Sequence, residues 1–239
     1  MSQVTALLTG RGNNTLADKN VKQLLGRPLL SYGARAGKQA QSVTAHFASS
    51  EDPKILAAAE AEGYAPIRRP DALAAPTARH VDALLHGMAE IQQRTGATPE
   101  ILVVILANAP TILPQWIDQS VQMLLSDPEL TAVAPVVRDQ DHHPFRAKTL
   151  REDGLLGSFF DHGDADVSSN RQDLPPCFFL CHNFWTLRAE TLLNGPQGEP
   201  PWGFMGQRVA SLEIPQSIDV HEPEDLLRAE KWLRENGVA

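Results

Sequence analysis

The chain has 239 residues, and its 21 lysines and arginines are outnumbered by 29 aspartates and glutamates, so the formal net charge is −8 at pH 7. This length corresponds to roughly one or two domains and is sufficient for a full core without disulfides or a structural metal. An acidic chain with no basic helix or aromatic platform is not typical of nucleic-acid-binding proteins, although local lysines and arginines can still bind a small anion.

Neither membrane insertion nor a disulfide framework is predicted. The apolar run at residues 101–106 is far shorter than the roughly 18 residues that a spanning helix needs, and the N-terminus lacks the pattern of a signal peptide. Cys177 and Cys181 lie in an apolar run and are expected to be packed, reduced thiols. We therefore expect a cytoplasmic protein that binds neither nucleic acid nor membrane.

Strands and helices are expected to alternate over the first 140 residues or so. Short apolar stretches predict strands at 4–9, 43–47, 64–67, 101–106 and 131–137. Helical spacing and start signals predict helices from about Pro28, from 53 to 62 with Asp52 as N-cap, at 78–94 and at 116–125. This alternation is typical of an α/β fold with a doubly wound, mainly parallel sheet and helices on both faces.

The pattern changes after residue 138. Residues 138–176 are polar and loop-like, and residues 177–187 form a strongly apolar stretch that predicts a strand. A final helix is expected at 222–234, with Leu226, Leu227, Ala229 and Trp232 facing inward. There is no repeat and no low-complexity linker, so we predict a single domain over residues 1–239 with an inserted arm.

The loop after the first strand is the first candidate binding site. Ligands of open α/β sheets bind beyond the carboxyl ends of the strands. Gly10 and Gly12 allow close approach of the backbone to a ligand, while Arg11, Lys19 and Lys22 supply positive charge, a combination suited to phosphate. The spacing matches neither a Walker A loop nor GxGxxG, so an ordinary turn is the alternative interpretation.

A second candidate site precedes the final helix. Asp219 and His221 lie in a short extended stretch, where side chains two residues apart share one side. Such a pair could hold a divalent cation, because carboxylates suit Mg²⁺ and imidazole tolerates Mn²⁺. The alternative is that Asp219 and Glu222 merely begin the last helix.

These segments resemble, in the same order, the motifs of the acylneuraminate (CMP-sialic acid synthetase-like) cytidylyltransferases. The matching residues are 11–20, 25–30, 49–52, 69–74, 141–144, 171–175, 217–219, 223–226 and 229–230. The resemblance implies a Rossmann-like nucleotidyltransferase (GT-A-like) fold and a CTP-dependent enzyme that transfers CMP to an anionic acceptor, releasing pyrophosphate. It also implies dependence on Mg²⁺ (or Mn²⁺) and a homodimer in which an arm at about 138–185 crosses to the partner subunit.

The resemblance also implies roles for individual residues. Arg11, Lys19 and Asp219 are expected to be catalytic, and Asp219 to bind metal together with His221, which stands where the family usually has a second aspartate. The expected nucleotide-binding residues are Leu8, Gly10, Arg11, Gly12, Asn13, Lys19, Arg69 and Asn108. The expected acceptor-binding residues are His142, His143, Arg146, Arg171, Gln172, His182 and Asn183.

Departures from the family's pattern bear on the acceptor. The segment at 13–15 is one residue shorter and lacks a lysine, which Lys22 could replace, and residues 107–111 match only loosely. Phe179 stands where sialic acid enzymes carry an arginine for the sugar carboxylate. We therefore predict a 2-keto-3-deoxy sugar acid other than ordinary sialic acid as the acceptor. A small phosphonate such as phosphonoformate is the first alternative, and a non-catalytic protein that binds CTP or a CMP-sugar is the second.

Overall fold

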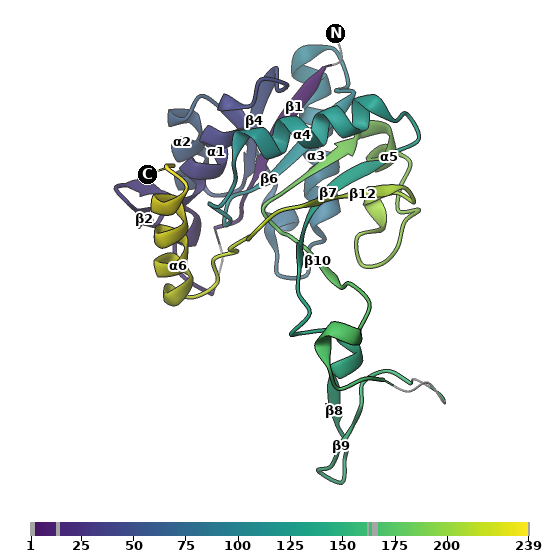
Figure 1. The fold of residues 1–239 in the computed structure, drawn as a ribbon. Helices are drawn as coiled ribbons and strands as arrows, with labels where there is room; N and C mark the ends of the chain where they lie inside the picture. The colour runs from purple at the N-terminus through teal and green to yellow at the C-terminus, as the bar shows by residue number, and fades with distance from the viewer. Residues whose placement is uncertain (1–2, 13–14, 162, 164–166, 239) are drawn as a thin grey trace.

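A mixed eight-stranded sheet forms the centre of the molecule (Figure 1). The computed structural model describes residues 3–12, 15–161, 163 and 167–238. The strand order is β10-β7-β11-β6-β1-β4-β5, and β12 pairs with β7 outside this path. The strands are β1 (Val4–Thr9), β4 (Ala45–Ser50), β5 (Ala65–Arg68), β6 (Ile101–Leu106), β7 (Ala132–Arg138), β10 (Phe178–Leu180), β11 (Phe184–Arg188) and β12 (Val209–Glu213). β1, β4, β5 and β6 pair in parallel, and β11 lies antiparallel between β6 and β7.

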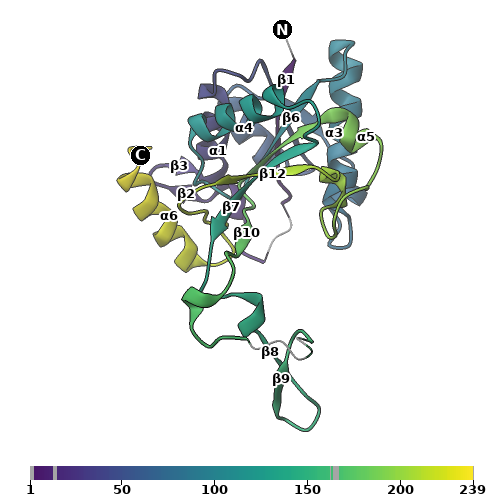
Figure 2. The same ribbon diagram turned by 45° about the vertical axis from the view of Figure 1, so that its right-hand side comes forward.

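Helices cover both faces of this sheet (Figures 1 and 2). They are α1 (Leu29–Gln39), α2 (Pro53–Ala61), α3 (His80–Thr95), α4 (Pro114–Ser126), α5 (Ala189–Leu193) and α6 (Pro223–Glu235). Residues of α1, α2 and α4 share one apolar cluster, and residues of α3 and α5 share another. Along β6, Val103 and Ile105 belong to the first cluster while Leu102 and Val104 belong to the second. A strand buried on both faces requires such a continuous apolar run.

The predicted fold class is confirmed, and several elements match in detail. The first strand and the strand at 101–106 have the predicted bounds. The helix α2 begins at Pro53, and the Asp52 carboxylate caps it by accepting a hydrogen bond from the Lys54 N–H at 2.8 Å. None of the helices in the described part of the chain is long and apolar enough to cross a membrane.

Two predictions on the second half are wrong. The single strand expected at 177–187 is two strands, β10 and β11, separated by Cys181, His182 and Asn183. Leu227 does not face inward: its exposed fraction is 69 %, and Leu233 is the buried leucine of α6, beside Ala229 and Trp232. The inward stripe of α6 packs on Leu29 and Tyr32 of α1, and this contact selects which face of the helix is covered.

Of the predicted arm, the part between β7 and β10 projects away from the sheet (Figures 1 and 2). It contains a hairpin of β8 (Lys148–Leu150) and β9 (Leu156–Ser158) and the short 3₁₀ helices at Pro144–Arg146 and Arg171–Asp173. Large apolar side chains on it face solvent, among them Leu150, Leu156 and Phe159, with exposed fractions of 72 %, 70 % and 62 %.

Candidate functional site

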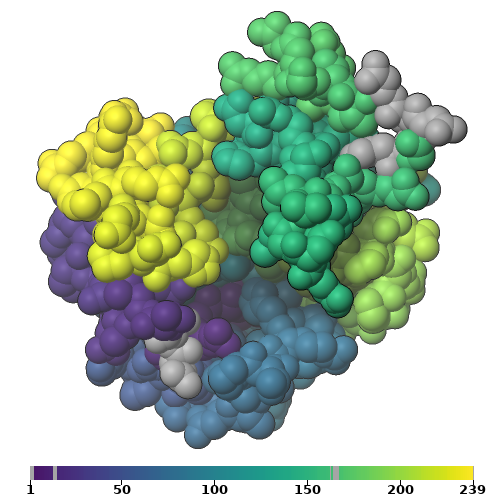
Figure 3. All heavy atoms as spheres, turned by 90° about the horizontal axis from the view of Figure 1, so that it is seen from below, coloured from purple at the N-terminus to yellow at the C-terminus, as the bar shows by residue number. Residues whose placement is uncertain are grey.

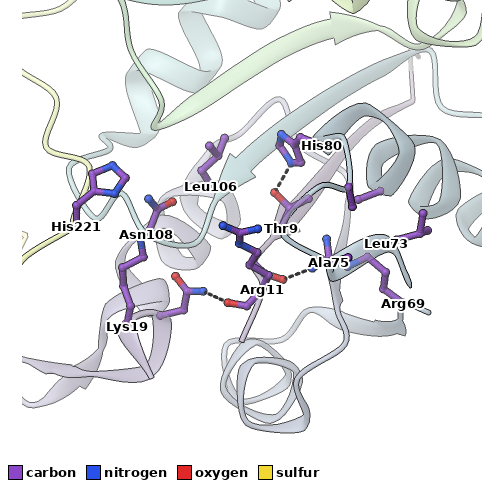
Figure 4. A pocket seen from close by; sticks show the side chains of 14 residues that line it. Thr9, Arg11, Lys19, Arg69, Leu73, Ala75, His80, Leu106, Asn108 and His221 are labelled. Carbon is purple, nitrogen blue, oxygen red and sulfur yellow. Dashed lines mark hydrogen bonds between the residues drawn. The ribbon is translucent and has the colours of Figure 1, made fainter. Parts of the chain in front are cut away.

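A cavity of about 270 Å³ lies at the carboxyl ends of β1 and β6 (Figure 4). Its lining residues are Thr9, Gly10, Arg11, Lys19, Asn20, Arg69, Leu73, Ala75, Ala78, His80, Ala83, Leu106, Asn108 and His221. Viewed from the side of the arm, the molecule is hollowed between its N-terminal half, the arm and the C-terminal segment (Figure 3). The structure thus brings together Gly10, Arg11, Lys19, Arg69, Asn108 and His221, which were predicted from separate segments.

One wall of the cavity carries the cations Arg11 and Lys19. Lys19 lies in a short 3₁₀ helix, Lys19–Val21, and only 7 % of it is exposed. Burial lowers the pKa of Lys19, with Arg11 acting in the same direction and Asp219 opposing it. The Asn20 amide donates a hydrogen bond to the Arg11 carbonyl at 2.9 Å. Two positive side chains on one wall make the cavity suitable for an anionic ligand.

His221, from the segment before α6, lies on the same side of the cavity as Lys19 and Asn108 (Figure 4). The Val220 N–H donates to the Asn108 carbonyl at 2.9 Å, which ties this segment to the end of β6. The Asp219 carboxylate accepts a hydrogen bond from the Asn108 amide and contacts His221 Nε2 at 3.0 Å. Asp219 and His221 therefore lie on the same side, as predicted. Burial raises the pKa of Asp219, while His221 and Lys19 act against that shift.

Asp219 and His221 are two side chains that could bind a metal ion, and two ligands alone do not enclose one. Within residues 3–12, 15–161, 163 and 167–238, no group of three or more His, Cys, Asp or Glu side chains could hold a metal ion. Mg²⁺ in nucleotide enzymes is commonly held by one or two carboxylates together with substrate phosphates and water. Asp219 and His221, with Lys19 nearby, are the residues that could hold a Mg²⁺ ion, and the ion could bind phosphate as well.

The Arg69 side chain is held in place by hydrogen bonds to other residues of the protein. Its Nη2 donates to the Gly10 carbonyl and to Glu51 Oε2, each at 2.7 Å, and the Arg69 side chain is 4 % exposed. Its Nε atom is buried and has no hydrogen-bond partner among the described residues. Arg69 lines the cavity, but this nitrogen is closed off from solvent.

Two further predicted nucleotide residues sit beside the cavity rather than in its wall. The Leu8 side chain is fully buried in the core, so only its backbone could serve a ligand. The Gly12 N–H donates to Glu51 Oε1 at 2.6 Å. Asn13 lies outside the described residues.

The break between β10 and β11 holds two predicted acceptor residues. His182 packs against Trp185 and Trp202, with ring centroids 5.7 and 5.3 Å apart. Burial lowers the pKa of His182, although the nearby Asp219 acts to raise it. Asn183 differs from the prediction: it is fully buried, its amide donates to the Thr111 carbonyl at 3.3 Å, and its side-chain oxygen accepts from the Phe184 N–H at 2.9 Å.

The other predicted acceptor residues lie on the projecting arm, and none of them lines the cavity. His142 Nδ1 contacts Asp139 Oδ2 at 2.7 Å, and this partner raises the pKa of His142. His143 is buried and accepts a hydrogen bond from the Phe145 N–H at 3.1 Å. Arg146 and Arg171 both interact with Asp141: Arg146 donates a hydrogen bond to its carbonyl at 3.4 Å, and Arg171 forms an ion pair with its carboxylate. The Gln172 N–H donates a hydrogen bond to the Asn170 side chain.

Sequence reasoning missed His80, which begins α3 and lines the cavity. Its Nε2 is hydrogen-bonded to Thr9 Oγ1 at 3.0 Å. Burial, with the nearby Arg69 and His182, lowers the pKa of His80 to about 4, so the imidazole is neutral at neutral pH. A histidine at a helix start carries no local signal, because only the packing of α3 against the sheet brings it to β1.

Known sequences similar to this chain are cytidylyltransferases. A 3-deoxy-manno-octulosonate cytidylyltransferase of an Anaeromyxobacter species is 26 % identical over 167 residues, covering 69 % of this chain and 62 % of the relative. An N-acylneuraminate cytidylyltransferase of Oncorhynchus mykiss is 26 % identical over 225 residues, covering 92 % of this chain and 49 % of the relative. A second 3-deoxy-manno-octulosonate cytidylyltransferase, from Desulfosudis oleivorans, is 30 % identical over 142 residues, covering 58 % of this chain and 54 % of the relative. No protein-family profile matches the chain.

The matched stretches span only about half to three fifths of these relatives' own lengths. Among solved structures, a CMP:2-keto-3-deoxy-manno-octonic acid synthetase complexed with CTP superimposes with a TM-score of 0.71 at 15 % identity, over 98 % of this chain and 100 % of that one. A 4-diphosphocytidyl-2C-methyl-D-erythritol synthase from Anaerococcus prevotii superimposes with a TM-score of 0.66 at 10 % identity, over 98 % of this chain and 99 % of that one. The resemblance to the sugar-acid cytidylyltransferases is confirmed by the sequence relatives, and the nucleotidyltransferase fold by the structures.

Proposed function

We propose that this chain is a CTP-dependent cytidylyltransferase that transfers CMP to a sugar acid and releases pyrophosphate. The observation that carries the proposal is the convergence of Arg11, Lys19, Asn108 and His221 on one cavity at the carboxyl ends of β1 and β6. Asp219 does not line this cavity itself, but it is hydrogen-bonded to Asn108 and contacts His221. The names of the sequence relatives support the same chemistry.

In this reaction a hydroxyl oxygen of the acceptor, which loses its proton to water, attacks the α-phosphorus of CTP. A new P–O bond forms to the acceptor, the bond from the α-phosphorus to the bridging oxygen of the β-phosphate breaks, and pyrophosphate leaves with that electron pair. Phosphoryl transfer of this kind needs alignment and neutralisation of charge more than covalent help from the protein. Arg11 and Lys19 would bind the triphosphate, and Arg69, which lines the same cavity, would contact the nucleotide.

Asp219, assisted by His221, would hold Mg²⁺ or Mn²⁺ in this site. Bound there, the ion supplies charge neutralisation at the phosphates and lowers the pKa of an acceptor hydroxyl. Asp219 must be ionised for this role; burial raises its pKa, and the neighbouring His221 and Lys19 offset part of that shift.

For the acceptor we propose a 2-keto-3-deoxy sugar acid other than ordinary sialic acid. Two of the three curated relatives carry octulosonate in their names, and Phe179 stands where an arginine for a sialic acid carboxylate is expected. His182, near Asp219 and between Trp185 and Trp202, is the candidate contact within one chain.

We further propose a homodimer in which the arm places His142, Arg146, Arg171 and Gln172 at the cavity of the partner subunit. The exposed apolar side chains of the arm support this proposal, because such surface on one projecting segment is typical of an interface.

The testing experiment is pyrophosphate release with CTP and Mg²⁺ against two panels, 2-keto-3-deoxy sugar acids and small phosphonates. Release with a sugar acid alone is the expected result. Release only with a phosphonate would replace the proposed acceptor and keep the reaction. Binding of CTP without release for any acceptor would favour a non-catalytic nucleotide-binding protein.

Replacement of the proposed metal ligand is a prediction of this mechanism. Asp219→Ala should reduce the rate of metal-dependent pyrophosphate release by about a hundredfold or more, because the ion loses its only proposed carboxylate. The matched control is Glu230→Ala, which removes a carboxylate paired with Arg234 on the outer face of α6. Full activity in Asp219→Ala, with an unchanged circular dichroism spectrum, would disprove the role of Asp219.

A further inference from the structure

We infer that Glu51 is a positioning residue for the nucleotide loop: with Arg69 it fixes the backbone on both sides of Arg11 and so aims that guanidinium at the triphosphate. The inference rests on the proposed function for the identity of the ligand. Its structural basis is a closed network of Gly10, Arg11, Gly12, Glu51 and Arg69.

The network holds the loop through two hydrogen bonds, one on each side of Arg11. The Gly10 carbonyl, before Arg11, accepts a hydrogen bond from Arg69 Nη2 at 2.7 Å. The Gly12 N–H, after Arg11, donates to Glu51 Oε1 at 2.6 Å. The same Arg69 nitrogen donates to Glu51 Oε2 at 2.7 Å, which closes the ring. The peptide units that flank Arg11 are therefore both held by one ion pair.

Three neighbouring strands supply this network. The loop follows β1, Glu51 follows β4, and Arg69 follows β5, with the Arg69 N–H bonded to the Ser50 carbonyl at 3.0 Å. Since parallel strands end at the same edge of the sheet, the register of β1, β4 and β5 places the three groups side by side. The glycines fit this approach: a Cβ on Gly12 would lie 2.4 Å from Asp52 Oδ2, and one on Gly10 would lie 2.9 Å from the Ala107 Cβ.

The ion pair is mostly shielded from water, since the Glu51 and Arg69 side chains are only 14 % and 4 % exposed. Burial alone would raise the pKa of Glu51, but the hydrogen bonds from Arg69 and Gly12 outweigh it, and the pKa lies below its ordinary value. Charge-assisted hydrogen bonds of this kind are stronger than neutral ones. Because the Gly12 N–H is engaged by Glu51, the loop would serve a phosphate mainly through the Arg11 side chain.

The test compares the affinities of CTP and CMP by calorimetry, without acceptor. Glu51→Gln keeps the size of the side chain but removes the charge that Arg69 faces. It should weaken CTP binding by about tenfold, and CMP binding much less, because CMP lacks the two phosphates that Arg11 would contact. The matched control is Glu62→Gln, which alters a carboxylate of similar exposure, 17 %, that directly follows α2 and pairs with Arg35 of α1 at 3.7 Å. A purely structural role would lower the melting temperature but leave the ratio of CTP to CMP affinity unchanged.

A second measurement needs no nucleotide. Amide hydrogen exchange of the peptide that spans residues 10–12 should accelerate in Glu51→Ala and stay unchanged in Glu62→Ala. Faster loop exchange together with a reduced preference for CTP over CMP would support the inference. An unchanged preference in Glu51→Gln, with wild-type CTP binding intact, would overturn the role of Glu51 alone. Failure of the wild-type chain to bind CTP would instead overturn the proposed function and, with it, this nucleotide role.

Discussion

At the scale of single residues, Lys19 illustrates how the fold prepares a charge for an anion. The side chain is nearly buried, and burial holds its pKa below the ordinary lysine value. The folded protein therefore favours the neutral amine more than water does, and a bound triphosphate would stabilise the ammonium. The nearby Asp219 already compensates part of this effect.

This arrangement predicts a pH dependence of nucleotide binding. CTP binding should favour the protonated amine, so affinity should be full below the lowered pKa of Lys19 and fall as the pH rises through it, at a lower pH than for an ordinary lysine. Lys19→Arg should bind CTP without this alkaline loss, because a guanidinium stays protonated. Calorimetric titrations between about pH 7 and pH 10 would measure it. An identical alkaline decline in Lys19→Arg would show that another group is responsible.

At the scale of elements, α6 shows how the core selects one face of a helix. The helix begins at Pro223 with a capping box between Glu222 and Asp225, as its sequence favours. Its buried residues are Ala229, Trp232 and Leu233, and Trp232 lies 5.9 Å from Trp116, centroid to centroid. Leu227 faces solvent although its hydrophobicity equals that of Leu233.

Leu227 and Leu233 of α6 therefore form a matched pair for mutagenesis. Leu233→Ala should reduce the free energy of unfolding by about 2 to 5 kcal/mol, since a fully buried leucine leaves a cavity. Leu227→Ala should change it by less than about 0.5 kcal/mol, because the side chain is exposed. Urea denaturation of both variants measures the difference. Equal destabilisation by the two substitutions would contradict the packing described for α6.

At the scale of the whole molecule, the arm carries its apolar surface away from the body (Figure 2). If this surface is the proposed dimer interface, Leu156→Asp should shift the protein to monomer and lower pyrophosphate release, because a buried charge opposes association. The control is Leu193→Asp, which alters an exposed leucine of α5 on the body. Sedimentation velocity would measure both effects. A wild-type protein that is monomeric at micromolar concentration would contradict the proposal.

Local sequence determined much of this protein on its own. The apolar runs of β1 and β6, the cap at Asp52 and the helical spacing of α3 and α4 depend on neighbours within a few residues, so they were predictable. The ordered motifs likewise indicated Arg11, Lys19 and Asp219 before any contact was known.

Only the tertiary structure decided which distant groups meet. Gly12 and Glu51 are 39 residues apart, Thr9 and His80 are 71 apart, and Asn108 and Asp219 are 111 apart. The same holds for the antiparallel placement of β11 and the break at His182, because strand partners and helix faces are chosen by packing across the sheet. Local patterns carry no information on such contacts, since each one depends on the register of strands that are distant in the chain.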